Sequence, residues 1–128
     1  MKYYFSKILA VPFDDAVSNV AQELKKEGFG ILTDIDVKAT LKKKLDVEFK
    51  KYRILGACNP SFAYQALQAE DKIGTMLPCN VIVQEISDGR VEVAAIDPIK
   101  SMQAIENHRL ENIANQVQKK LNKVIDSL

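Results

Sequence analysis

The chain lacks tryptophan altogether and has one histidine, two cysteines, four prolines and five glycines among its 128 residues. A structural zinc site normally takes four Cys or His ligands, so a zinc finger is excluded. In a reducing compartment we expect both cysteines to be thiols and not a structural disulfide, although their spacing along the chain does not forbid a bridge. The longest apolar run falls well short of the ~20 residues that cross a bilayer, and Lys2 and Lys7 interrupt any leader-like segment. We therefore expect no membrane association and a cytoplasmic location.

Apolar residues make up 47% of the chain and charged residues 27%, which is typical of a single globular domain over residues 1–128. The formal net charge is only +1, so a general nucleic-acid-binding role is not expected. Lysines are locally enriched between Lys42 and Lys51, and we interpret that stretch as a solvated helix and loop.

The pattern of apolar residues and turn signals predicts an alternation of strands and helices. Residues 2–11 read as a strand that stops at Pro12, and residues 14–26 as a helix capped by Asp14 or Asp15. Further strands are predicted over 29–37, 52–57, 79–86 and 90–96, and further helices over 38–45, from Pro60 to about 71–74, and from about 110 to 128.

Asp88-Gly89 between two β-rich runs is the strongest local signal, because a two-residue hairpin turn needs residues that tolerate positive φ. With this turn, simple pairing places Ile86 opposite Val91 and Glu85 opposite Glu92. Together the elements predict an α+β fold: a two-layer sandwich with an antiparallel, twisted sheet of about five strands and amphipathic helices on one face.

Two cysteine–asparagine pairs stand at predicted strand boundaries: Cys58-Asn59 before the helix at Pro60, and Cys79-Asn80 at the start of a strand. The start of a helix favours a thiolate or a bound anion. We therefore take Cys58, Asn59, Cys79 and Asn80 as candidate binding residues around one pocket, with the cysteine Cβ atoms close together, at the ~4.5 Å of a disulfide or somewhat beyond. The structural alternative is that both cysteines fill core gaps and that Asn59 only caps its helix.

Other chemistry is poorly supported by the sequence. His108 is expected to face solvent, and no metal or cofactor is implied. Asp34 and Asp36 share one strand face, as in any exposed alternating strand. Gly28 and Gly30 follow a helix and lack dinucleotide-binding spacing.

The segments Gly56-Ala57-Cys58-Asn59-Pro60 and Gly74-Thr75-Met76-Leu77-Pro78-Cys79-Asn80-Val81 resemble motifs of the domain of unknown function 302 family. The resemblance extends to residues 28–37, to Asp97-Pro98 and to the terminal amphipathic helix. It implies an antiparallel sheet backed by helices, and often a homodimer, but no established reaction. The lysine-rich stretch departs from the family pattern.

Three hypotheses remain. The first is a binding or sensing domain for a small-molecule or anionic ligand at the paired cysteines, without enzymatic activity. The second is a thiol or sulfur-chemistry enzyme, redox or persulfide, with Cys58 as nucleophile and Cys79 as resolving thiol. The third is a homodimeric interaction module in which the apolar stripe of the last helix meets a partner.

Overall fold

The computed structural model describes residues 2–128. Its sheet has five strands in the order β1-β5-β4-β3-β2, and every neighbouring pair is antiparallel. The predicted α+β architecture is confirmed. The strands are β1 (Tyr4–Leu9), β2 (Gly30–Asp36), β3 (Tyr52–Cys58), β4 (Cys79–Ser87) and β5 (Arg90–Ile96). The helices are α1 (Phe13–Lys26), α2 (Val37–Leu45), α3 (Pro60–Ala69), α4 (Pro98–Ser101) and α5 (His108–Asp126), with a 3-10 turn, η1 (Ile73–Met76), between α3 and β4.

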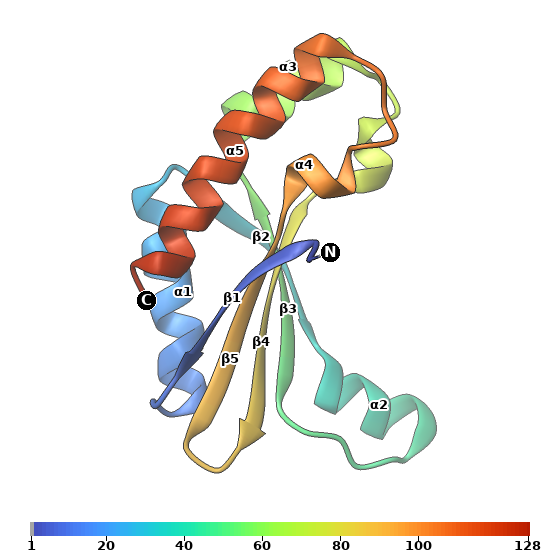
Figure 1. The fold of residues 1–128 in the computed structure, drawn as a ribbon. Helices are drawn as coiled ribbons and strands as arrows, with labels where there is room; N and C mark the ends of the chain where they lie inside the picture. The colour runs from blue at the N-terminus through green and yellow to red at the C-terminus, as the bar shows by residue number, and fades with distance from the viewer. Residues whose placement is uncertain (1) are drawn as a thin grey trace.

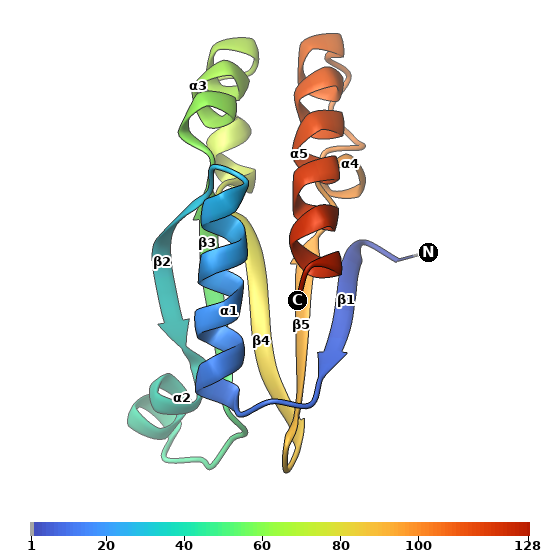
Figure 2. The ribbon, with the colours of Figure 1, turned by 90° about the vertical axis from the view of Figure 1, so that its left-hand side faces the viewer.

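Two long amphipathic helices, α1 and α5, lie side by side over one face of the sheet (Figures 1 and 2). Their apolar stripes meet the inward side chains of the central strands to form one core. Leu24, Leu55, Val81, Val93 and Leu121 in this core are fully buried. Burial of a side chain of this kind contributes about 1.5–3 kcal/mol, so the core is the main source of stability.

Helix α1 begins at Phe13, one residue earlier than the sequence predicts. Pro12 occupies the N-cap position and makes no side-chain cap hydrogen bond, so Asp14 and Asp15 lie inside the first turn. They favour the helix through its dipole instead of by capping a free N–H group. The expected capping role of these two residues was therefore wrong.

The β4–β5 hairpin turns at Asp88-Gly89 as predicted, with Gly89 at a φ of 76°. Its register differs from the simple one, because a bulge at Ile86 makes Glu85 the partner of Val91 and Gln84 the partner of Glu92. The predicted Glu85–Glu92 pair does not form. Instead the Gln84 amide donates a 2.8 Å hydrogen bond to the Glu92 carboxylate. The bulge thus replaces a repulsive pair with an attractive one.

Helix α2 lies apart from the α1–α5 layer, on the opposite side of the sheet (Figure 1). It contains no buried residue. The other face of the sheet therefore has no helical layer over it in residues 2–128. None of the helices in this part of the chain is both long and apolar enough to cross a membrane.

Candidate functional site

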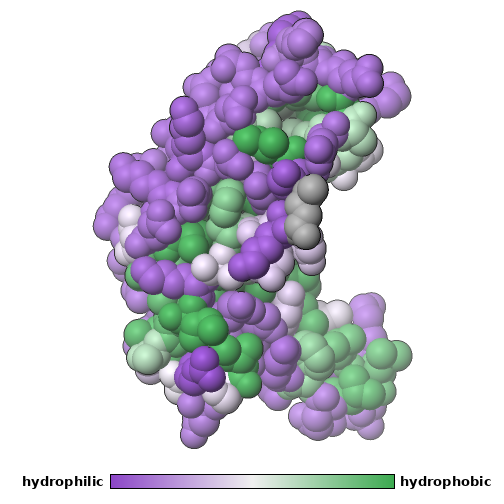
Figure 3. Space-filling view, in the orientation of Figure 1, coloured by the Kyte–Doolittle hydropathy of each residue, from purple (hydrophilic) through white to green (hydrophobic). Residues whose placement is uncertain are grey.

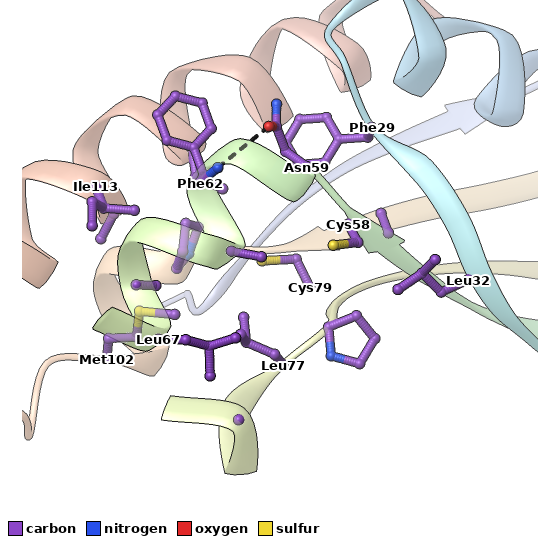
Figure 4. A pocket seen from close by; sticks show the side chains of 18 residues that line it. Phe29, Leu32, Cys58, Asn59, Phe62, Leu67, Leu77, Cys79, Met102 and Ile113 are labelled. Carbon is purple, nitrogen blue, oxygen red and sulfur yellow. Dashed lines mark hydrogen bonds between the residues drawn. The ribbon is translucent and has the colours of Figure 1, made fainter. Parts of the chain in front are cut away.

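A cavity of about 310 Å³, partly open to solvent, lies where β3 ends and β4 begins, beneath α3 and beside α5 (Figure 4). Its walls come from the ends of β2, β3 and β4 and from α3, η1, α4 and α5. Phe29 and Leu32 border it from β2 and the residue before it, Phe62 and Ala66 from α3, and Val117 from α5. Nearly all of the lining is hydrocarbon, and the main heteroatoms are the side-chain sulfurs and the amide of Asn59. Such a surface favours an apolar occupant.

Asn59 holds α3, the helix that lies over this cavity, in place. Its side-chain oxygen accepts from the Phe62 backbone N–H at 3.5 Å, which caps α3, and Pro60 occupies the first helical position. Its amide also donates to the Glu27 carbonyl at the end of α1, at 3.4 Å. The predicted cap is therefore present, and it joins two helices as well as starting one. Both oxygen and nitrogen are thereby used within the protein.

The opposite end of α3 is held by a second asparagine. The Asn107 amide donates to the Ala69 carbonyl at 2.9 Å, and the Asn107 oxygen accepts from the Arg109 N–H at the start of α5. The hydrogen bonds of Asn59 and Asn107 therefore connect the two ends of α3 to α1 and α5.

A buried carboxylate, Asp97, holds the α4 segment that forms the last wall of the cavity. Asp97 is 6% exposed and caps α4 by accepting from the Ile99 N–H at 3.0 Å. The Gln118 amide donates to both of its oxygens. This contact holds the α4 segment against α5. Pro98 and Met102 of that segment border the cavity.

Cys58 and Cys79 both line the cavity, and Figure 4 shows their sulfur atoms directed into it. Ala57 is the direct partner of Cys79 across the β3–β4 ladder, so Cys58 lies one residue farther along. No disulfide joins them, and both are free thiols. Of the spacings expected from the sequence, disulfide distance is therefore wrong, because Cys58 lies one residue beyond the position opposite Cys79.

The two thiols have different surroundings. Cys58 is partly exposed, whereas Cys79 is buried. Burial raises the pKa of the Cys79 thiol to about 11, and the nearby Cys58 adds a smaller contribution in the same direction. Cys79 therefore keeps its proton at neutral pH, where it is a weak nucleophile.

Asn80 does not lie at the cavity. It follows Cys79 in β4, pairs with Gly56, and projects from the opposite face of the sheet, where it borders a shallow depression with Tyr52 and Gln84. Alternation along a strand separates Cys79 from Asn80. The predicted grouping of all four Cys and Asn side chains in one pocket was therefore wrong for Asn80.

Signals for the apolar wall were weaker in the sequence. Phe62, Ala63, Ala66 and Leu67 are recognisable as helix positions, but the cavity between them and Leu77 depends on tertiary packing. Apolar residues beside both Cys-Asn pairs were the only sequence signal available.

Comparison with known proteins agrees with this fold. The profile described as domain of unknown function DUF302 matches residues 5–128. The chain belongs to the DUF302 family. A crystal structure of an uncharacterized conserved DUF302 protein from Bacillus stearothermophilus superposes with a TM-score of 0.89, at 24% identity, over 98% of each chain. No curated protein matches the sequence.

Elsewhere in this DUF302 domain the titratable groups make structural contacts. Asp34 forms two hydrogen bonds with Arg53, which lower the pKa of Asp34, and Asp36 caps α2 by accepting from Ala39. His108 is fully exposed beside Glu111. Within residues 2–128, no three His, Cys, Asp or Glu side chains are grouped as metal ligands.

The lysine-rich stretch of this DUF302 domain follows α2 into an exposed loop. Lys42 pairs with Asp46 at 2.8 Å and with Glu48 at 3.0 Å, and Lys38 lies 3.8 Å from Glu48. These acids offset part of the local positive charge.

Proposed function

We propose that this DUF302 domain binds a small, neutral, largely apolar molecule in the cavity beneath α3. The single observation that supports the proposal is an apolar space of about 310 Å³ bordered by two free thiols. An engineered cavity of about 150 Å³ already binds benzene, and natural ligand pockets begin at about 300 Å³. The cavity therefore has room for a molecule larger than a single benzene ring.

The lining argues for a neutral ligand over the anionic one considered from the sequence. A buried charge is costly unless it is paired, and no Lys or Arg borders this space. The Phe62 N–H at the start of α3 is not free to receive an anion, because it already donates to Asn59. The proposal places the domain in the cytoplasm, where reducing conditions keep both thiols free.

Binding is tested by titrating the protein with toluene and with indole, following amide and methyl chemical shifts by NMR. We expect saturable shifts for Phe62, Ala66 and Val117. Ala66→Leu puts extra hydrocarbon into the wall and should weaken binding by at least about tenfold, the effect of roughly 1.4 kcal/mol. Gln65→Leu adds hydrocarbon on the exposed side of the same helix and is the matched control. Non-saturable shifts spread over the surface would contradict the proposal.

The thiol-enzyme alternative receives less support. It requires Cys79 as resolving thiol, but burial keeps that thiol protonated and no disulfide is present. It nevertheless makes a clear prediction, since a dithiol enzyme would form a Cys58–Cys79 disulfide under mild oxidation. An unchanged count of two free thiols in unfolded protein after such treatment would exclude it.

We propose as a second function that two copies associate through the face of the sheet that α1 and α5 leave uncovered. The stripe on α5 cannot serve this purpose as expected from the sequence, because Leu110, Leu121 and Val124 are buried against the chain's own sheet. The uncovered face carries several apolar side chains where a solvated antiparallel sheet usually has polar ones. They are Tyr4, Ile8, Ile35, Tyr52, Ile54, Ile82, Ala94 and Ile96.

A second copy fits this face because the chain also supplies the element needed to cover it. Leu45, at the end of α2, is 66% exposed, and Val47 and Phe49 in the loop that follows are also exposed. This loop lies on the same side of the sheet as α2 (Figure 1). Hydrophobic surface gathers over α2, and the molecule is concave between α2 and the α4 end (Figure 3). The sheet face measures roughly 24 by 20 Å, or on the order of 500 Å². A stable interface buries about 800 Å² on each partner, so the α2 region of each copy must supply the rest.

Light scattering after size-exclusion chromatography tests this second function. We expect twice the mass of the 14.3 kDa chain, and the monomer mass for Ile82→Lys at the centre of the face. Gln116→Lys on the exposed side of α5 should leave the dimer unchanged. A monomeric wild-type protein at tens of micromolar would contradict dimer formation.

A further inference from the structure

The two cysteines at the cavity are suited to different tasks. Cys58 is partly exposed at the end of β3, and its sulfur points into the cavity (Figure 4). A reagent that reaches this sulfur from the cavity therefore contacts apolar walls, which include Leu32 and Pro78.

A second observation concerns Cys79. Its side chain is 8% exposed, points into the same space, and has no hydrogen-bond partner within residues 2–128. The thiol keeps its proton at neutral pH because burial disfavours the thiolate. Cys79 is therefore an unused S–H donor that faces the position of a bound ligand.

We infer that Cys58 is a covalent modification site for small apolar α,β-unsaturated carbonyl compounds that enter the cavity. The inference rests on the proposed function and names its ligand class. The Cys58 thiolate adds to the β-carbon of the compound, the carbon–carbon π pair moves toward the carbonyl oxygen, and the resulting enolate takes a proton from water. One S–C bond forms and no group leaves, so neither an oxidant nor a reductant is needed. The Cys79 S–H is placed to donate to the carbonyl oxygen.

This chemistry follows from the surroundings of the two sulfurs. A neutral electrophile is compatible with the hydrocarbon walls, whereas a charged one loses its hydration there. Holding the compound against Cys58 also replaces a bimolecular encounter with a nearly unimolecular step. Cys79 does not compete for the electrophile, because a protonated thiol is a weak nucleophile.

The test compares two maleimides, N-phenylmaleimide and a maleimide bearing a carboxylate, in the full-length reduced protein at pH 7. Each rate is divided by that for N-acetylcysteine with the same reagent, and the modified residue is located by peptide mass spectrometry. We expect a single adduct on Cys58 and a relative rate at least about tenfold higher for the phenyl reagent, since burying a phenyl group against hydrocarbon is favourable. Cys58→Ala should abolish the adduct.

Cavity-filling variants show whether the maleimide reaches Cys58 through the cavity or reacts with it only because the thiol is exposed. Ala66→Leu should slow the phenyl reagent alone, while Gln65→Leu should change neither rate. Ala63→Leu, also on the cavity wall, gives a second measurement where Ala66→Leu is poorly folded. Equal relative rates for the two reagents, or earlier labelling of Cys79, would overturn the inference.

The toluene titration of the wild-type protein distinguishes the two failures. If toluene binds and Cys58 shows no preference for the phenyl reagent, the covalent site is refuted and the apolar ligand site stands. If toluene does not bind and the two maleimides react alike, both proposals fail.

Discussion

The side-chain amide of Gln118 donates to both carboxylate oxygens of Asp97, at 3.1 and 3.2 Å. Asp97 is the one buried charged side chain among residues 2–128. The contact joins the turn after β5 to the middle of α5, across 21 positions of sequence. A buried carboxylate depends strongly on such donors, because removing one leaves an unsatisfied charge.

Gln118→Ala should therefore lower the free energy of unfolding by about 1–3 kcal/mol. Urea unfolding monitored by circular dichroism measures the change. Gln116→Ala, on an exposed part of the same helix, should change stability by less than about 0.5 kcal/mol. Equal effects of the two substitutions would contradict the importance of the Asp97 contact.

Gly56→Ala should be strongly destabilising. A Cβ atom at this position would lie 2.1 Å from Thr33 Oγ1 and 2.6 Å from Pro78 Cγ. The exposed Thr33 side chain can rotate away, but the Pro78 ring is rigid, so we expect a loss of about 1–3 kcal/mol and a displaced cavity wall at Pro78. Gly30→Ala, where no heavy atom lies within 4 Å of the new Cβ, is the control. Thermal unfolding of both variants measures the difference.

Stability should fall at alkaline pH because of Cys79. The pKa of this thiol rises on folding from its ordinary value of 9.0 to about 11. Between these two pH values the unfolded chain loses the proton while the folded chain retains it, so rising pH favours unfolding. The stabilising contribution is complete below about pH 9 and declines by roughly 2–3 kcal/mol up to pH 11. Urea unfolding of wild type and Cys79→Ala at several pH values isolates the effect, and parallel pH profiles would refute it.

Asn59 should contribute through two separate bonds. Asn59→Ala loses both the α3 cap and the contact with the Glu27 carbonyl, and should cost about 0.5–2 kcal/mol. Asn59→Ser keeps a good capping oxygen and loses only the donor to Glu27, so it should cost less. Urea unfolding at pH 7 ranks the two variants, and a larger loss for Asn59→Ser would contradict the assignment.

Much of the fold was predictable because local signals and tertiary packing agree. The Asp88-Gly89 turn, the Asn59-Pro60 helix start and the spacing of Leu110, Val117 and Leu121 each depend on a few neighbouring residues. The register beyond Ile86 was not predictable, since a bulge is decided by which pairing across the hairpin is better packed and bonded.

The candidate site was only partly predictable for a similar reason. The two cysteines reach one cavity because β3 and β4 are neighbours, which the order of elements suggests. The position of Asn80 follows from strand alternation once the start of β4 is known. The cavity volume depends on how α3, α4 and α5 pack together, and no local pattern encodes that distance.

Helix α3 is anchored at both ends, by Asn59 to the end of α1 and by Asn107 to the start of α5. A ligand that displaced this helix would break at least one of these hydrogen bonds, each of which contributes about 1 kcal/mol to stability. Entry is therefore expected at the open side of the cavity, past rim side chains such as Leu67, which is 44% exposed. The cavity should consequently select ligands by their width, with an affinity that falls abruptly once a ligand is wider than the fixed space beneath α3.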